Sequence, residues 1–329
     1  MRLWTVVTVL FFVAPAWGEV WKPVTVGKVD GLSNIVVSKD GKTAYAVAQG
    51  KYFAVTIDGR LNGPVEAPVW PSPPTDMIPH GNVAVGQNHI EKAWLVQPTL
   101  RYGHGAIGDK IEAGGFKVQL RDGRELVYEL ADQYVFEDLS PRLADVDGDG
   151  LDEIILVRAS LSEGAAVSIY RVGERRLEHF AVSPSIGLAY RWLNPVGVAD
   201  FDADGEMDVA VVEMPHLGRS LVIYSRTASR LIERGRLSGF SNHHMGSTII
   251  DLSVAFDVNH DGVVDMILPD EERRFLQAMT FKGGEFKRIA EGPVGAVITT
   301  SVVAGDFNGN GAIDFVYGRA DGTIEAVFR

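Results

Sequence analysis

Short runs of alternating apolar and polar residues, separated by turn residues, recur along most of the chain. Residues 34–48 form two such runs around Asp40-Gly41, and residues 115–130 form another pair around Asp122-Gly123. In the second half, similar pairs cover residues 166–182 and 220–237. Runs of this length, bounded by turn signals, are typical of β-strands joined in hairpins. We therefore expect an all-β protein without a helix of substantial length.

Four copies of one acidic nine-residue pattern lie in the second half, at residues 145–153, 200–208, 257–265 and 306–314. Each copy has an oxygen-bearing side chain at positions 1, 3, 5 and 9, and glycine at position 6. Oxygen ligands at this spacing, with a backbone carbonyl at position 7, suit a hard cation such as Ca²⁺. Glycine suits the tight bend because it accepts a positive φ without strain.

The four patterns start 49 to 57 residues apart, and strand-like runs flank each of them. A repeat of about 50 residues with about four short strands is typical of a propeller blade. The length of the chain then predicts a β-propeller of six four-stranded blades, with seven as the alternative. Residues 300–329 supply about three strands, so we expect residues 19–29 to add the fourth and close the ring.

An EF-hand is excluded, because that loop needs a bidentate Glu at position 12 and a helix on each side. Position 12 is occupied here by Leu156, Val211, Leu268 and Tyr317, each inside a strand-like run. The remaining alternative is an acidic turn that binds no metal, which four copies in register make the less favoured interpretation. Because one continuous loop supplies every expected ligand, we expect calcium to be structural rather than catalytic.

The pattern Ala-Asp-Phe-Asp-x-Asp-Gly-x-x-Asp, followed by an apolar strand, resembles the FG-GAP or VCBS repeat of integrin α-subunits and of many secreted bacterial proteins. The resemblance covers roughly residues 141–325, while residues 19–140 share only the rhythm of strands and turns. It implies a β-propeller with up to four structural Ca²⁺ ions, each between the first two strands of a blade. The ligands it implies occupy positions 1, 3, 5, 7 and 9 of each loop: Asp145, Asp147, Asp149, Leu151 and Glu153; Asp200, Asp202, Asp204, Glu206 and Asp208; Asp257, Asn259, Asp261, Val263 and Asp265; Asp306, Asn308, Asn310, Ala312 and Asp314. The fourth loop has the fewest carboxylates, so we expect it to bind calcium most weakly.

Residues 1–18 resemble a secretory signal peptide, with Arg2, an apolar run over 3–13, and small residues at 16 and 18. Cleavage after Gly18 would leave residues 19–329 as one β-propeller domain, with divergent blades over 19–140 and calcium-bearing blades over 141–329. A retained membrane anchor is the alternative, but the apolar run is shorter than the roughly 20 residues of a membrane helix. We therefore expect a secreted or periplasmic monomer with no membrane span in the mature chain.

Composition supports this interpretation. The chain has no cysteine, which excludes disulfides and a lipid-anchored cysteine after the signal. Its net charge is −12, and the four loops hold fifteen of its 43 acidic residues. Nucleic acid is therefore not an expected partner.

A second set of residues, rich in Arg, His and Trp, falls in turn-rich segments that could meet over one end of a propeller. Arg pairs with carboxylates and Trp stacks on sugar rings, so a protein or carbohydrate ligand is the partner we expect. The alternative is that Trp192 packs between blades and the histidines cap turns. A calcium-dependent lyase or hydrolase acting on polysaccharide is a further hypothesis, although no nucleophile motif supports it and a non-enzymatic role is favoured. The candidate ligand-binding residues are Arg101, His104, Arg191, Trp192, His216, His243 and His244.

Overall fold

The computed structural model describes residues 19–56, 58–69 and 72–329, so the expected signal peptide lies outside the described residues. The described chain is all-β, as the alternating pattern predicts. Its one described helix is a three-residue 3-10 turn, Lys282–Gly284. No described helix is long and apolar enough to cross a membrane.

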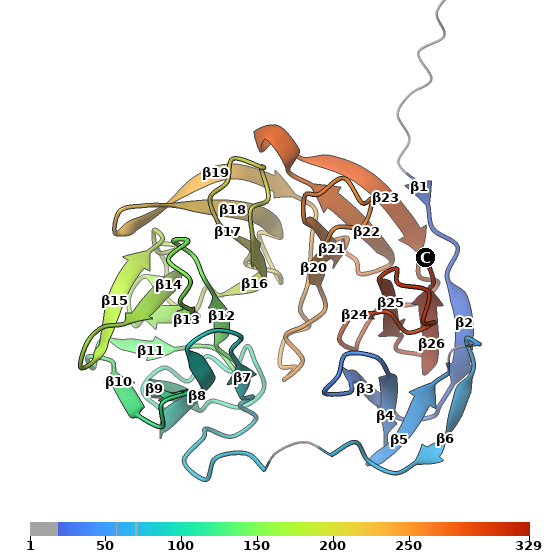
Figure 1. Ribbon diagram of the computed structural model, residues 1–329, viewed down its shortest axis with the longest axis horizontal. Helices are drawn as coiled ribbons and strands as arrows, with labels where there is room; N and C mark the ends of the chain where they lie inside the picture. The colour runs from blue at the N-terminus through green and yellow to red at the C-terminus, as the bar shows by residue number, and fades with distance from the viewer. Residues whose placement is uncertain (1–18, 57, 70–71) are drawn as a thin grey trace, which may run out of the picture.

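The first half of the chain contains two groups of four antiparallel strands (Figure 1). The first group consists of β3 (Leu32–Val37), β4 (Ala44–Ala48), β5 (Lys51–Val55) and β6 (Leu61–Val65). The second consists of β7 (Ala84–Val85), β8 (Ile90–Thr99), β9 (Glu112–Leu120) and β10 (Glu125–Glu129). A short strand, β11 (Tyr134–Phe136), pairs with both β9 and β13 and so joins the second group to the next one.

The second half repeats the arrangement, with each strand antiparallel to the one before it. One group contains β12 (Arg142–Ala144), β13 (Glu153–Ser160), β14 (Gly164–Val172) and β15 (Leu177–Val182). The next contains β16 (Leu193–Ala199), β17 (Asp208–Glu213), β18 (Ser220–Thr227) and β19 (Arg230–Ser238). It is followed by β20 (Val254–Phe256), β21 (Asp265–Pro269), β22 (Phe275–Thr280) and β23 (Lys287–Pro293).

The two ends of the chain form the last group together. It contains β24 (Val303–Gly305), β25 (Asp314–Gly318) and β26 (Thr323–Val327), and its fourth strand is β2 (Val24–Lys28). The prediction that residues 19–29 complete the C-terminal sheet is therefore confirmed. The first strand, β1 (Glu19–Val20), pairs in parallel with β23 of the neighbouring group. Figure 1 shows the groups following one another around a ring, with the β2–β26 pairing holding the two chain ends together.

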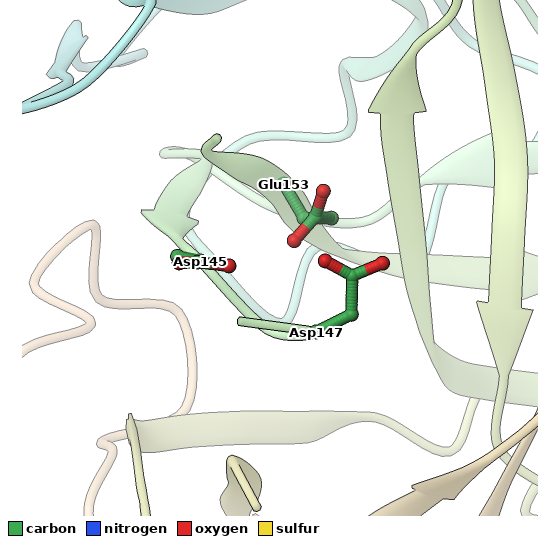
Figure 2. Close-up of side chains that lie close together, drawn as sticks. All are labelled: Asp145, Asp147 and Glu153. Carbon is green, nitrogen blue, oxygen red and sulfur yellow. The ribbon is translucent and has the colours of Figure 1, made fainter. Parts of the chain in front are cut away.

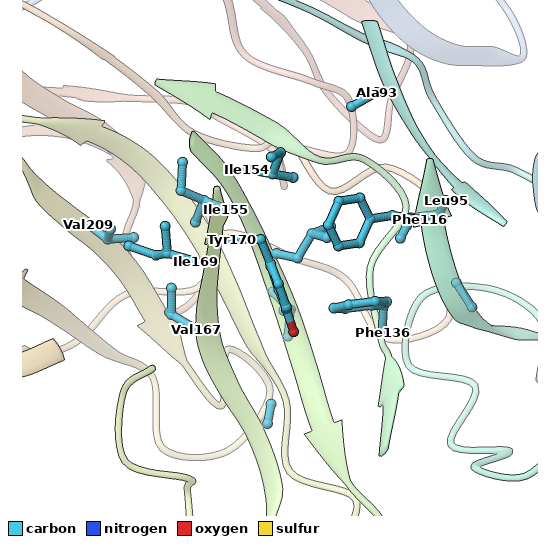
Figure 3. Close-up of a cluster of buried hydrophobic side chains, with 14 of the residues drawn as sticks. Ala93, Leu95, Phe116, Phe136, Ile154, Ile155, Val167, Ile169, Tyr170 and Val209 are labelled. Carbon is cyan, nitrogen blue, oxygen red and sulfur yellow. The ribbon is translucent and has the colours of Figure 1, made fainter. Parts of the chain in front are cut away.

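The core lies between neighbouring sheets, which explains why the middle strands are almost continuously apolar. Nearly all of β13 and all of β17 are buried, because both faces of these strands are covered. Figure 3 shows part of the largest cluster, where the ring of Tyr170 lies between aromatic and aliphatic side chains of adjacent strands. Tyr170 makes an edge contact with Phe116 at a centroid distance of 5.1 Å. Burial of each such large apolar side chain contributes about 1.5–3 kcal/mol to stability.

Candidate metal loops and the histidine cluster

The four acidic loops occupy equivalent places in the fold. They connect the first and second strands of their groups, between β12 and β13, β16 and β17, β20 and β21, and β24 and β25. Because strands within a group alternate in direction, all four loops lie at the same end of their sheets. This end of the ring is called the acidic end below.

All four loops also share one hydrogen-bond frame. The position-1 aspartate accepts a hydrogen bond from the backbone N–H of the position-6 glycine, at 2.9, 2.9, 2.9 and 3.0 Å in chain order. The position-9 carboxylate accepts one from the backbone N–H of position 2, at 2.8, 3.2, 3.0 and 3.0 Å. The position-5 side chain accepts one from position 7. The repeated sequence pattern therefore specifies one repeated loop geometry.

Two positions in each loop have a left-handed backbone. Position 6 is glycine in every loop, with φ between 84° and 91°, as the spacing predicts. Position 4 also has a positive φ, of 76°, 65°, 60° and 77° in chain order, and there the residues are Gly148, Ala203, His260 and Gly309. The sequence interpretation missed this second bend, because only two of the four loops mark it with glycine.

In the first two loops, three carboxylates lie close enough to hold one cation. Ligand oxygens of Asp145, Asp147 and Glu153 lie within 4.8 Å of one another, and so do those of Asp200, Asp202 and Asp208. Figure 2 shows the three side chains of the first loop. Burial raises the pKa of Glu153 to about 7 and that of Asp208 to about 6. An all-oxygen donor set with a rigid backbone frame fits Ca²⁺.

A lysine side chain of the same chain lies beside the third loop. The Nζ of Lys282 lies 3.1 Å from the Asp261 carboxylate, and it also donates a hydrogen bond to the backbone carbonyl of Asp261 at 3.4 Å. Position 3 is Asn259, so this loop offers one carboxylate fewer than the first two. One oxygen of the position-9 residue, Asp265, is buried without a hydrogen-bond partner. The oxygens thus fit a cation, but the lysine neutralises part of the charge that would attract it.

The fourth loop is closed by its own amides and by the chain end. Asn308 turns its side-chain N–H toward Asp314, donating a hydrogen bond at 3.2 Å. The backbone N–H of Arg329 donates to the same oxygen of Asp314 at 2.9 Å, and Asn310 donates to the Arg329 carbonyl at 2.5 Å. Both oxygens of Asp314 are therefore already hydrogen-bonded, whereas one oxygen of Asp306 is buried without a partner.

At the opposite end of the ring, four of the seven candidate ligand-binding residues come together. His216 and His243 are hydrogen-bonded through their ring nitrogens at 2.9 Å, and Trp192 packs edge-on against His243 at a centroid distance of 4.8 Å. His243 Nε2 lies 3.0 Å from the carbonyl oxygen of Ser247, which can only accept, so Nε2 carries the proton. Neutral His243 then accepts from His216 at Nδ1. Burial lowers the pKa of His243 to about 3 and that of His216 to about 4, which favours this neutral pair.

His104 joins the same region through residues that the sequence interpretation missed. Its Nδ1 lies 2.5 Å from Oε1 of the buried Glu137, and its ring lies 5.5 Å from that of Tyr190. Tyr190 stacks on Tyr102 at 4.9 Å, and Trp192 Nε1 donates a hydrogen bond to the Glu137 carbonyl at 2.9 Å. Burial raises the pKa of Glu137. No motif marks Glu137 in the sequence, because its partners lie far away along the chain. The histidine cluster is defined as Tyr102, His104, Glu137, Tyr190, Trp192, His216 and His243.

The side chains of the other three candidate residues contact backbone carbonyls rather than the side chains of this cluster. Arg101 donates a hydrogen bond to the Tyr134 carbonyl at 2.9 Å, and Arg191 donates to the Tyr190 carbonyl at 2.9 Å. His244 is exposed and contacts the carbonyl of Met245 at 3.1 Å. A cavity of about 890 Å³ lies instead along the first strands of several groups, and none of the seven candidates lines it.

Comparison with protein-family models identifies residues 140–211 as an FG-GAP-like repeat. The chain therefore carries the FG-GAP repeat that its acidic loops resemble. The matched segment contains the first two loops, which are the two with a preformed carboxylate cluster. A search of curated protein sequences found no match.

Solved structures resemble the chain only distantly. A structure of BBS1N in complex with ARL6DN, soaked with lead, is 13% identical, with a TM-score of 0.38 over 92% of this chain and 80% of that one. A structure of the calcium-binding protein regucalcin from Agrobacterium tumefaciens is 11% identical, with a TM-score of 0.41 over 94% of both chains. Likeness at this level carries no argument about ligand or activity.

Proposed function

We propose that this chain is an exported, calcium-stabilised β-propeller that acts as a binding scaffold. The observation that carries the proposal is the single hydrogen-bond frame shared by four acidic loops, two of which gather three carboxylates. The strand pairing supports a single domain of six blades over residues 19–329, with the last blade built from both chain ends. Export rests on the signal-like sequence of residues 1–18.

Calcium would be held by side-chain oxygens at positions 1, 3, 5 and 9 and by the position-7 carbonyl. The role proposed for it is structural, because these ligands come from one loop between two strands of one sheet. Extracellular calcium modules bind at roughly 10⁻⁴–10⁻³ M. At about 1 mM Ca²⁺, a site with a Kd near 10⁻⁴ M contributes about 1.4 kcal/mol to stability.

The loops should not bind equally. The first two should bind most tightly, because each has three converging carboxylates. The third should be weaker because of Lys282, and the fourth weakest because amide and backbone donors already occupy Asp314.

The test is a calcium titration of residues 19–329 by calorimetry, after treatment with chelator. We expect two tighter sites and up to two weaker ones, together with a higher melting temperature in 1 mM Ca²⁺ than in EDTA. Magnesium at the same concentration is the control, since Ca²⁺ tolerates irregular oxygen cages better than Mg²⁺ does. Absence of calcium binding at millimolar concentration would overturn the proposal.

A further inference from the structure

Large apolar side chains are exposed on successive loops at the end of the ring opposite the acidic end. Leu188 and Tyr190 lie between β15 and β16, Leu217 between β17 and β18, and Met245 between β19 and β20. Their exposed fractions are 55%, 50%, 67% and 51%. Exposed apolar residues on neighbouring loops, rather than scattered singly, are a feature of interaction sites. These four residues and Arg191 are called the apolar face below.

The histidine cluster connects these loops beneath the apolar face. The backbone N–H of Met214 donates to the Trp192 carbonyl at 2.8 Å, which ties the first loop to the second. The His216–His243 hydrogen bond ties the second loop to the third. The stacked pair of Tyr102 and Tyr190 fixes the exposed aromatic ring on a buried one.

The same loops hold strained backbone. Tyr190, Met214 and Arg219 all have positive φ, at 58°, 47° and 52°. Such residues cost about 1–3 kcal/mol each and persist where the surroundings fix them, often in ligand-binding segments. A surface ordered in this way loses little entropy when a partner binds.

The distribution of charged residues on these loops indicates the chemistry of the partner. Residues 183–192, 214–219 and 239–250 contain no Asp or Glu, although the whole chain has a net charge of −12. They contain Arg191, Arg219 and three histidines. Arg219 is neutralised by Glu271 and Glu272 at 3.5 and 3.4 Å, whereas Arg191 has no ion-pair partner among the described residues. The three loops of the apolar face therefore bring no carboxylate of their own against an acidic partner, and Arg191 is available to pair with one.

We propose that the apolar face docks a protein segment that combines apolar side chains with Asp or Glu. This inference rests on the proposed scaffold function and names its class of partner. Leu188, Leu217 and Met245 would cover the partner's apolar side chains, and Arg191 would pair with a carboxylate. A carbohydrate fits less well, because three of the four exposed side chains are aliphatic and the Trp192 and Tyr102 rings are buried.

The experiment is selection of a displayed random 12-residue peptide library on calcium-loaded residues 19–329. We expect enriched peptides with apolar residues and Asp or Glu, and each enriched peptide is then synthesised and titrated. Leu217→Ser with Met245→Ser should weaken binding at least tenfold, because both apolar side chains would be buried against the partner. Arg191→Glu should weaken binding of acidic peptides more than of their Asn and Gln counterparts.

The matched control is Ile232→Ser with Val127→Ser, two exposed apolar residues on β19 and β10, away from the apolar face. This pair should leave peptide affinity unchanged, and every variant must retain the wild-type calcium titration and melting temperature. Polygalacturonate and alginate oligosaccharides are titrated in parallel.

Three results would overturn the inference: no enrichment above an uncoated surface, enriched peptides without acidic residues, or affinity unaffected by the apolar-face variants. Binding of the oligosaccharides in place of peptides would also overturn it. In each of these cases, an unchanged calcium titration would still support the proposed calcium-stabilised scaffold. Failure of the docking proposal can therefore be told apart from failure of the proposed function.

Discussion

The two ends of the ring are built in different ways. At the acidic end, each loop makes the same hydrogen-bond frame within nine consecutive residues, so one local pattern repeats four times. At the opposite end, the histidine cluster draws on five separate parts of the chain, and its hydrogen bonds join residues as far apart as Tyr102 and Tyr190. A site formed within one loop can recur in every repeat, whereas a site formed by distant segments of the chain occurs once. The acidic end is therefore suited to bracing the fold, and the other end to a specific ligand.

The largest expected effect is a loss of calcium-dependent stability at the acidic end, which the opposite end should not share. Asp147→Asn with Asp202→Asn removes one ligand charge from each of the first two loops while keeping a side-chain oxygen. We expect the double variant to lose about 3 kcal/mol of calcium-dependent stability in 1 mM Ca²⁺, the sum of two sites. Urea unfolding with and without calcium measures this loss. In EDTA the variant should be at least as stable as the wild type, because it removes one like charge from each crowded carboxylate cluster. A loss of stability in EDTA would show that the effect does not come from calcium.

A second prediction uses acid to probe the histidine cluster. The folded pKa of His243 is lowered to about 3, so the unfolded chain takes up the proton first, near its ordinary value of about 6.5. The stability contributed by neutral His243 is thus present above pH 6.5 and lost progressively as pH falls from 6.5 toward 3. His243→Phe should cost about 2 kcal/mol at pH 7.5, because His216 and the Ser247 carbonyl lose their partner.

The difference in unfolding free energy between wild type and His243→Phe should therefore shrink as pH falls from 7 to 5. Both proteins are measured in EDTA. The contribution of the acidic loops to the difference then cancels, because their buried carboxylates titrate in both proteins. A difference that stays constant with pH would contradict the neutral histidine pair.

A third prediction tests the bend at position 4 of the acidic loops. His260 has a φ of 60°, a left-handed conformation that costs a non-glycine residue roughly 1–2 kcal/mol. His260→Gly should stabilise the calcium-free protein by about 1 kcal/mol, after allowance for the greater freedom of glycine in the unfolded chain. Gly148→Ala in the first loop is the reverse substitution at position 4, and it should destabilise the calcium-free protein by a similar amount. Thermal unfolding in EDTA measures both, and equal melting temperatures would rule out strain at this position.

The smallest effect concerns Lys282 beside the third loop. Lys282→Gln removes the cation 3.1 Å from Asp261 and should tighten calcium binding at that loop. Because the pair is partly exposed, the gain should not exceed about 1 kcal/mol, or roughly fivefold in Kd. Calorimetric titration compares this variant with Lys287→Gln, which lies nearby on β23 and pairs with Glu285 instead. Unchanged affinity would show that Lys282 does not compete with the metal.

Much of the fold could be predicted because its rules are local. The alternation around Asp40-Gly41 and Asp122-Gly123 identified the hairpins β3–β4 and β9–β10, and the acidic loops marked the junction of the first two strands in four groups. The pairing of residues 19–29 with the last sheet followed from a missing strand. The bend at position 4 was missed, because Ala203 and His260 carry no turn signal of their own.

The sequence by itself determined the strand pattern, the four loops and the residues that face one another inside each loop. These depend on spacing along the chain, and spacing is what a sequence records directly. Only the tertiary structure decided that Lys282 and the backbone of Arg329 reach the last two loops, and that Glu137 lies beside His104. Such contacts arise from how the sheets pack around the ring. Residues far apart in the chain become neighbours there, and no sequence motif predicts these contacts.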